Sequence, residues 1–195
     1  MFRWLARKWA VNDKLPEKVD LIAVISYGAT PYTLTNASYL VTQRAKEISK
    51  LRPEAIIFWG TFSKNQDGIR TEFTDKKGIL PPDKNFYVGQ VSSTTDECEA
   101  IFYTASQYRR PLHTIVVVAE ASHSRRAKKV WRYYFPTANI CFQSINAVEA
   151  QDPENPMFFQ RNWKVWLLVN ILLYPLYLGK NGVKRMSKIN FRQPT

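Results

Sequence analysis

The sequence has few of the residues that mark disulfide-bonded or metal-binding proteins. Only two cysteines occur among 195 residues, Cys98 and Cys141, and their spacing matches neither a metal site nor a redox motif. A reduced, cytosolic setting is the simplest interpretation, although a disulfide between the two cysteines stays open. With one relevant histidine, His123, and scattered carboxylates, we predict no metal cofactor.

Long apolar runs are also missing. The longest candidate, residues 165–178, is shorter than the ~20 residues that a membrane-spanning helix needs, and it contains Asn170 and Pro175. The first ten residues are basic and aromatic but lack the apolar core of a signal peptide. We therefore expect a cytoplasmic protein, which at most lies peripherally at the inner face of a membrane.

Acidic residues are scarce. The chain has 28 Lys and Arg against 16 Asp and Glu, a net charge of +12, and no acidic residue follows Glu154. Such an excess favours anionic partners: a phosphorylated small molecule, an acidic membrane surface or nucleic acid. No nucleic-acid-binding motif is present, so nucleic acid is the least favoured of the three. The basic residues beyond Glu154 are Arg161, Lys164, Lys180, Lys184, Arg185, Lys188 and Arg192.

What the chain does contain is a repeated alternation of strand and helix. The β-branched run Ile115–Val118 is typical of a buried parallel strand, and a helical pattern over 123–135 follows it. Similar strands are predicted at 19–26, 54–59, 85–91 and 138–142, with helices at 35–51 and from Thr94, and a short or irregular helix at 71–78. This order predicts an α/β fold: a mostly parallel sheet with helices on both faces.

Three regions follow from the changes in composition. Residues 1–18 form an amphipathic basic segment, 19–150 the α/β domain, and 151–195 a basic, apolar helical extension. The N-terminal helix fits either packing on the domain or attachment to an anionic membrane. For residues 165–178, packing on the domain, on a partner or on a membrane stays open.

A candidate site is expected where the parallel strands end, because their carboxyl ends meet at one edge of the sheet. His123 and Arg126 lie three residues apart in the predicted first turn of a helix, a position that favours an anion such as phosphate or carboxylate. The residues expected at this edge are Ser26, Tyr27, Gly28, Gly60, Thr61, Ser92, Thr95, Glu97, Ser122 and His123.

Two interpretations of these side chains stay open. In one, His123 acts with Glu97 or Glu72 as a general acid–base pair while Arg126 holds a phosphate. In the other, Arg126 pairs with Glu97 or Glu72 and joins helices, and Glu97 forms a capping box with Thr94. No nucleophile elbow and no phosphate-binding loop is present.

Four short motifs, in this order, resemble the bacterial domain-of-unknown-function family 218, the family of SanA, ElyC and YdcF. They are residues 20–25 leading to Gly28, Arg44 followed by AIIFWG, Thr95-Asp96-Glu97-Cys98 with Glu72 upstream, and residues 122–127, SHSRRA. The likeness covers residues 19–145. Two positions depart from the family: Gly60 is followed by threonine instead of a second glycine, and Cys98 replaces the usual asparagine.

The resemblance implies a Rossmann-like three-layer fold and a link to cell-envelope biogenesis. The helix start with His123 and Arg126, together with the two basic aromatic ends, leads us to expect a phosphate-bearing or nucleotide-like ligand, with a nucleotide or S-adenosylmethionine as candidate cofactors. Both simple binding and a transferase or hydrolase reaction on such a substrate stay open, as does a non-enzymatic scaffold or regulator on a membrane surface.

Overall fold

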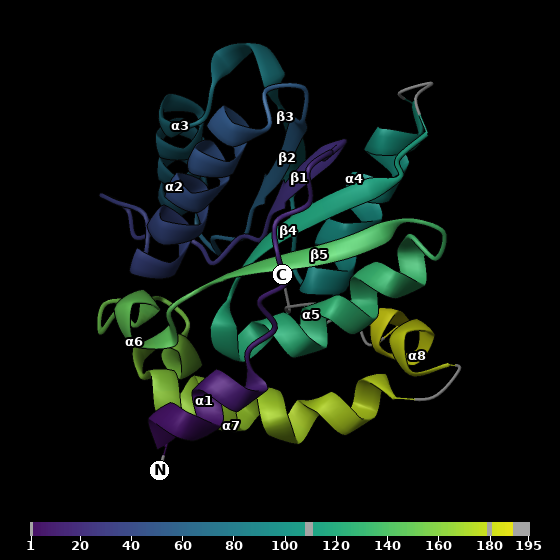
Figure 1. Cartoon of the computed structure of the whole chain (residues 1–195). Helices are drawn as coiled ribbons and strands as arrows, with labels where there is room; N and C mark the ends of the chain where they lie inside the picture. The colour runs from purple at the N-terminus through teal and green to yellow at the C-terminus, as the bar shows by residue number, and fades with distance from the viewer. Residues whose placement is uncertain (1, 108–110, 179–180, 189–195) are drawn as a thin grey trace.

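The computed structural model describes residues 2–107, 111–178 and 181–188. Its centre is a five-stranded, all-parallel sheet in the order β3-β2-β1-β4-β5 (Figure 1). The predicted α/β architecture is thus confirmed, and the fold is Rossmann-like. The strands are β1 (Leu21–Val24), β2 (Ile56–Thr61), β3 (Asn85–Gln90), β4 (Thr114–Glu120) and β5 (Asn139–Ile145).

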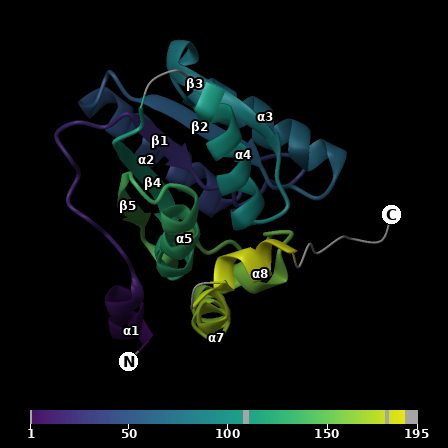
Figure 2. The ribbon, with the colours of Figure 1, turned by 90° about the vertical axis from the view of Figure 1, so that its right-hand side faces the viewer.

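Helices cover both faces of the sheet. Helices α2 (Asn36–Leu51) and α3 (Gln66–Ile79) lie on one face, and α4 (Thr94–Gln107) and α5 (Ala121–Tyr134) on the other (Figures 1 and 2). Because both faces are covered, the central strands are apolar throughout: every residue of β1 is buried, as are residues 115–120 of β4. A short 3₁₀ turn, η1 (Pro82–Lys84), precedes β3.

The segment before β1 protects an edge of the sheet. After helix α1 (Phe2–Trp9), the chain runs beside β5, and Asp13 exchanges hydrogen bonds with the backbone of Phe142. Further along, the hydroxyl of Ser144 donates to the carbonyl of Val11 at 2.5 Å. An uncovered edge strand is a template for unwanted pairing, and this segment occupies it.

The C-terminal extension folds back over the carboxyl edge of the sheet. Helix α7 packs on α5, and α8 packs on α4 and α5 (Figure 2). Helix α7 ends at Leu173, and Pro175 lies at the start of the tighter turn η3 that follows it. The elements are α6 (Ala147–Ala150), η2 (Phe158–Arg161), α7 (Trp163–Leu173), η3 (Tyr174–Tyr177) and α8 (Gly182–Lys188). Lys180 and Arg192, counted among the basic residues above, lie outside the described residues.

Residues 165–178 therefore form two elements, and α7 has one buried and one exposed side. Trp163, Trp166, Leu167 and Asn170 are buried against the domain, whereas Val165, Leu168 and Leu172 are exposed. Within the described ranges, no helix combines the length and apolarity required to cross a bilayer.

Two helix starts differ from the prediction. The polar stretch expected as a loop up to Gly68 already contains the first turn of α3, because the side chain of Asn65 caps it by accepting from the N–H of Gly68. Helix α5 begins two residues earlier than predicted, with Glu120 as its cap.

The expected capping box of Thr94 and Glu97 is wrong. Helix α4 begins at Thr94, and Ser93 caps it by accepting from the N–H of Asp96. Asp96 in turn accepts from the N–H of Ser92. The shift by one residue leaves the carboxylate of Glu97 free to point into the protein.

Substitution of two glycines by alanine should have opposite effects on stability. A Cβ at Gly60 would meet the carbonyl oxygen of Gly89 at 3.0 Å and Val91 at 3.2 Å, whereas one at Gly78 in α3 would meet nothing within 4 Å. We expect Gly60→Ala to lower the free energy of unfolding by about 1–3 kcal/mol, and Gly78→Ala to raise it by about 0.5–1 kcal/mol. Urea denaturation of both variants checks this; equal effects would contradict the packing at Gly60.

Candidate functional site

The first polar cluster at the carboxyl edge surrounds a buried lysine. The ammonium of Lys76 lies 2.8 Å from Glu72 Oε1, and 2.9 Å from both Ser26 Oγ and the carbonyl oxygen of Gly60. Both Lys76 and Glu72 are fully buried. The three acceptors match the three N–H bonds of an ammonium group.

The two carboxylates of this cluster tie down the loops that follow β1 and β2. Glu97 Oε1 accepts from the N–H of Ser26 at 3.1 Å and from its hydroxyl at 2.7 Å. Glu72 Oε2 accepts from the backbone N–H groups of Phe62 and Ser63 at 2.7 and 3.1 Å. The polar atoms are thus satisfied within the protein, as buried groups usually are.

Glu97 is nevertheless poised to hold a proton near neutral pH. Burial raises its pKa from the usual 4.5 to about 7, although the charge of Lys76 and the hydrogen bonds from Ser26 act in the opposite direction. Lys76 was not predicted as a site residue. Glu72 and Lys76 are four residues apart, the spacing of an ion pair on a helix, but the helix was expected to be short or irregular there.

The second cluster lies between the ends of β1 and β4 and contains His123. Its Nδ1 lies 3.0 Å from the hydroxyl of Tyr27, and its Nε2 lies 2.9 Å from Thr94 Oγ1. The Tyr27 hydroxyl accepts from the N–H of Glu120. A neutral imidazole with its proton on Nε2 fits both contacts, with Tyr27 donating to Nδ1 and Nε2 donating to Thr94 Oγ1.

Burial keeps that imidazole neutral. It lowers the pKa of His123 well below 6.5, and the nearby charge of Arg126 acts in the same direction. Neither Glu97 nor Glu72 is bonded to His123, since both carboxylates have the partners given above. The structure thus does not bring together the acid–base pair considered from the sequence.

Glu120, which the sequence analysis did not include, is the buried cap of α5. Its carboxylate accepts from the N–H groups of Ser122 and His123 at 2.9 and 3.2 Å. Burial raises the pKa of Glu120 from 4.5 to about 7, against the contacts from Ser122, His123 and Trp166. A carboxylate thus already occupies the helix N-terminus where an external anion was expected. Glu120 could have been predicted as this cap, because it is an acidic residue directly before a helix.

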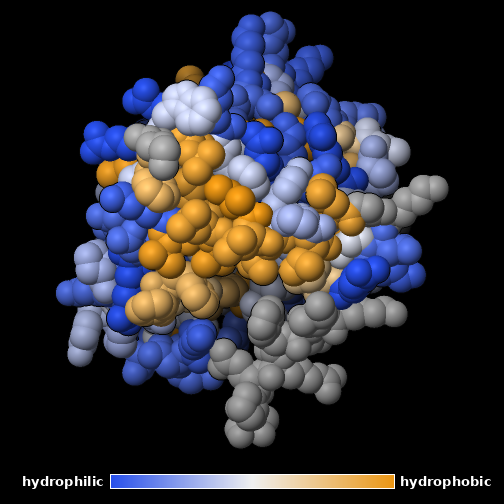
Figure 3. Space-filling model, turned by 90° about the horizontal axis from the view of Figure 1, so that it is seen from below, coloured by the Kyte–Doolittle hydropathy of each residue, from blue (hydrophilic) through white to orange (hydrophobic). Residues whose placement is uncertain are grey.

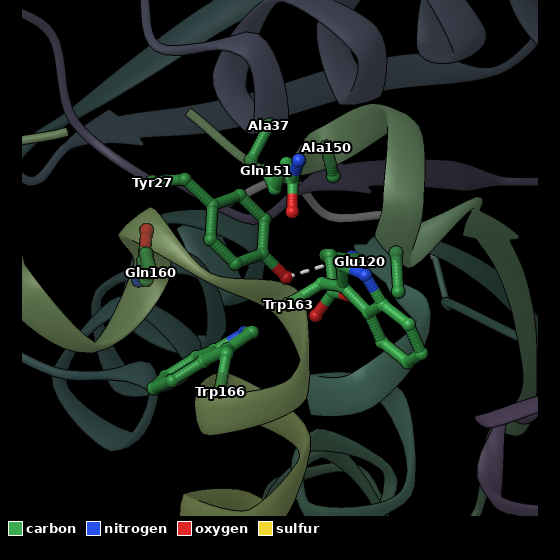
Figure 4. Close-up of a pocket in the computed structure, with 9 residues that line it drawn as sticks. Tyr27, Ala37, Glu120, Ala150, Gln151, Gln160, Trp163 and Trp166 are labelled. Carbon is green, nitrogen blue, oxygen red and sulfur yellow. Dashed lines mark hydrogen bonds between the residues drawn. The ribbon is translucent and has the colours of Figure 1, made fainter. Parts of the chain in front are cut away.

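Little space remains beside Glu120. Figure 4 shows Tyr27 and Glu120 joined by a hydrogen bond, with Trp163 and Trp166 of α7 lining the same space. The cavity between them measures about 10 Å³, the room of a single water molecule. A larger open groove of about 500 Å³ lies farther along the edge, between α1 and the end of β5, and is lined in part by Arg3 and Arg7.

Arg126 faces the extension instead of open solvent. Its Nε donates to Asn170 Oδ1 at 2.9 Å, its Nη1 donates to the hydroxyl of Tyr177 at 3.1 Å, and the guanidinium lies over the Tyr177 ring at 5.4 Å. Only 9% of Arg126 is exposed. Across the described part of the chain, no carboxylate lies within ion-pair distance of it. The considered pairing of Arg126 with Glu97 or Glu72 is therefore wrong.

The other predicted residues are placed as follows. Gly28 has a positive φ of 81°, which glycine adopts readily, and its carbonyl accepts from Thr35 Oγ1. Thr61 bonds to the hydroxyl of Tyr87, and Thr95 is buried in the first turn of α4. The carbonyl of Ser122 accepts from the indole of Trp9 at 2.8 Å. The edge thus gathers most of the predicted residues, but in two separate clusters.

Comparisons with models of known protein families, with curated sequences and with solved structures found no match. The resemblance to domain-of-unknown-function family 218 thus stays a prediction from the motifs.

Cysteines and metal-binding side chains were also considered from the sequence. Cys98 and Cys141 are both free and buried. Among residues 2–107, 111–178 and 181–188, no three His, Cys, Asp or Glu side chains gather into a metal-binding group.

The raised pKa of Glu97 predicts a pH-dependent stability. A carboxyl group whose pKa is 4.5 unfolded and about 7 folded binds more protons in the native state between these values, so stability falls as pH rises through this window. Relative to Glu97→Gln, the free energy of unfolding of the wild type should decrease by about 3 kcal/mol from pH 4.5 to pH 7.5. Denaturation of both proteins across this range measures the difference, and a constant difference would contradict it.

The bonding around His123 predicts its tautomer. Nitrogen NMR should show a neutral ring with the proton on Nε2 and a pKa well below 6.5, with the exposed His113 as the reference histidine. Tyr27→Phe should abolish the tautomer preference and lower stability by about 1–3 kcal/mol, because the N–H of Glu120 loses its acceptor. A ring that protonates at the usual pKa of 6.5 would refute this arrangement.

Proposed function

We propose that the protein binds a phosphate-bearing small molecule through Arg126, at the carboxyl edge of the sheet. One observation carries the proposal: a nearly buried guanidinium whose partners are a neutral amide and a neutral hydroxyl. Burying a charge without a counter-ion is unfavourable, by several kcal/mol when no compensation is present. An anion is the partner that this cation lacks.

The location supports the proposal. The strand order reverses direction between β1 and β4, and ligands of open parallel sheets bind in the crevice at such a switch point. Arg126 lies on α5, the helix that follows β4, on the same side as the His123 cluster. The proposal rests on Arg126 and not on the first N–H groups of α5, because Glu120 already binds these.

Binding at Arg126 requires the extension to move. A ligand would replace two hydrogen bonds that Arg126 donates to neutral acceptors, at Asn170 and Tyr177, by bonds to charged phosphate oxygens. Phosphate supplies the opposite charge, and its oxygens match the planar fork of arginine. The exchange is therefore favourable at the guanidinium, and it opposes the burial of α7 and η3 on the domain.

We propose ligand binding, and catalysis would be a further step. Both ring nitrogens of His123 are bonded within the protein, so acid–base catalysis would need the same opening movement that frees Arg126. Nucleotides, S-adenosylmethionine and polyprenyl phosphates are the ligand classes to screen. The link to cell-envelope biogenesis enters the proposal from the family resemblance alone.

Thermal unfolding with added ligands tests the proposal. A ligand present at 100 times its dissociation constant should raise the free energy of unfolding of the wild type by ~2.7 kcal/mol. Arg126→Gln should lose this response. Arg132→Gln is the matched control, because Arg132 is an exposed arginine in the last turn of the same helix. If inorganic phosphate, pyrophosphate and all screened ligands stabilise Arg126→Gln as much as the wild type, the proposal is wrong.

A further inference from the structure

The two ends of the described chain form one surface. Helix α1 lies beside α7 at the bottom of Figure 1. The rings of Phe2 and Trp163 approach edge to face at 6.5 Å, and those of Trp9 and Tyr174 at 5.4 Å. Helix α1 is also held to α5, since Arg125 donates to the carbonyl of Trp9. We call the surface built by α1, η2, α7 and η3 the lower face.

The lower face is strongly apolar. Leu172 is 74% exposed, Phe158 70% and Trp4 63%, far more than large apolar side chains usually show. Figure 3 looks at this surface and shows a continuous hydrophobic band across it, with hydrophilic residues on both sides. The other exposed apolar side chains of these elements are Phe159, Val165, Leu168 and Leu176. A contiguous apolar patch of this kind marks an interaction surface.

The polar residues of the lower face carry one sign of charge. Arg3, Arg7 and Lys8 project from α1, and Arg161 and Lys164 flank the start of α7; all five are exposed. No acidic residue occurs in residues 1–12 or after Glu154. An apolar band with cations around it is the pattern of helices that lie in the interface of an anionic bilayer.

We propose that the lower face docks on a bilayer that contains anionic lipids, with α1 and α7 lying in the interfacial plane. Charge complementarity selects this partner. A second copy of the chain placed symmetrically on the lower face would set these cations against each other, whereas anionic headgroups neutralise them. Helix α7 has 11 residues, so it lies on the membrane and does not cross it.

Docking would bring the covered edge of the sheet against the lipid. The exposed side of α7 carries Leu168 and Leu172, and its buried side carries Trp166 and Asn170, the latter bonded to Arg126. The docking proposal does not depend on a ligand at Arg126, because different side chains of α7 serve the two. Each proposal can therefore fail alone.

Co-sedimentation with vesicles tests docking. The full chain should bind vesicles of phosphatidylcholine with about 30% phosphatidylglycerol, as an anionic surface requires, and should bind neutral phosphatidylcholine vesicles at least about tenfold more weakly. Binding should weaken as salt is raised. Leu168→Gln/Leu172→Gln should reduce binding about tenfold or more, since two exposed leucines lose their burial in the interface.

Matched charge variants separate a specific surface from general basicity. Arg3→Gln/Arg7→Gln should reduce binding to anionic vesicles about tenfold or more, since each cation near the surface contributes. Lys50→Gln/Lys77→Gln removes the same charge from exposed sites on α2 and α3 and should leave binding unchanged.

Three results would overturn the docking proposal. One is equal binding to neutral and anionic vesicles, and another is binding that survives the leucine substitutions. The third is the absence of vesicle binding together with a dimer in solution that these substitutions dissociate, which would assign the lower face to a second copy of the chain. Circular dichroism of every variant confirms that the fold is retained, and all substituted side chains are exposed.

Discussion

The hydrogen bonds from Arg126 to Asn170 and Tyr177 connect the α/β domain to the end of its own chain. They hold α7 and η3 over the edge where a parallel sheet normally exposes its ligand site. The guanidinium is a poor choice for a purely structural contact. A well-packed apolar group at such a position is often as stabilising as a buried charge, because it carries no desolvation penalty. The buried charge of Arg126 therefore indicates more about function than its hydrogen bonds to Asn170 and Tyr177 do.

In the rest of the edge, the buried polar groups form their hydrogen bonds and ion pairs with one another. Lys76 takes three acceptors, Glu97 binds the turn after β1, and Glu120 caps α5 where an anion was expected. These groups fix the loops that a ligand would otherwise order. The consequence is an edge in two parts: the Lys76 cluster, whose polar groups bond to one another, and the Arg126 region, whose partners belong to the C-terminal extension.

The parallel sheet and the clustering of polar residues at its carboxyl edge followed from local patterns. The run Ile115–Val118 and the polar residues after it predicted both β4 and the place of His123, because buried parallel strands have a distinct composition. The partners of these side chains did not follow. Asn170 and Tyr177 are 44 and 51 residues from Arg126 in sequence, and nothing in their own segment indicates a cation. Lys76 was missed for a related reason: the turn-like residues before it concealed the helix that places it beside Ser26.

Helix α7 explains why the extension is apolar on more than one side. A helix that only covered the domain would be expected to present polar residues to water. In α7 the inward side is apolar because it packs on α5, and Asn170 is the exception that meets Arg126. The outward side is apolar as well, with Leu168 and Leu172 exposed and cations at its margins. Burial on the domain does not explain this second apolar side, so we infer a second environment for it. A lipid surface that contains anionic headgroups would match both the exposed leucines and the cations at their margins.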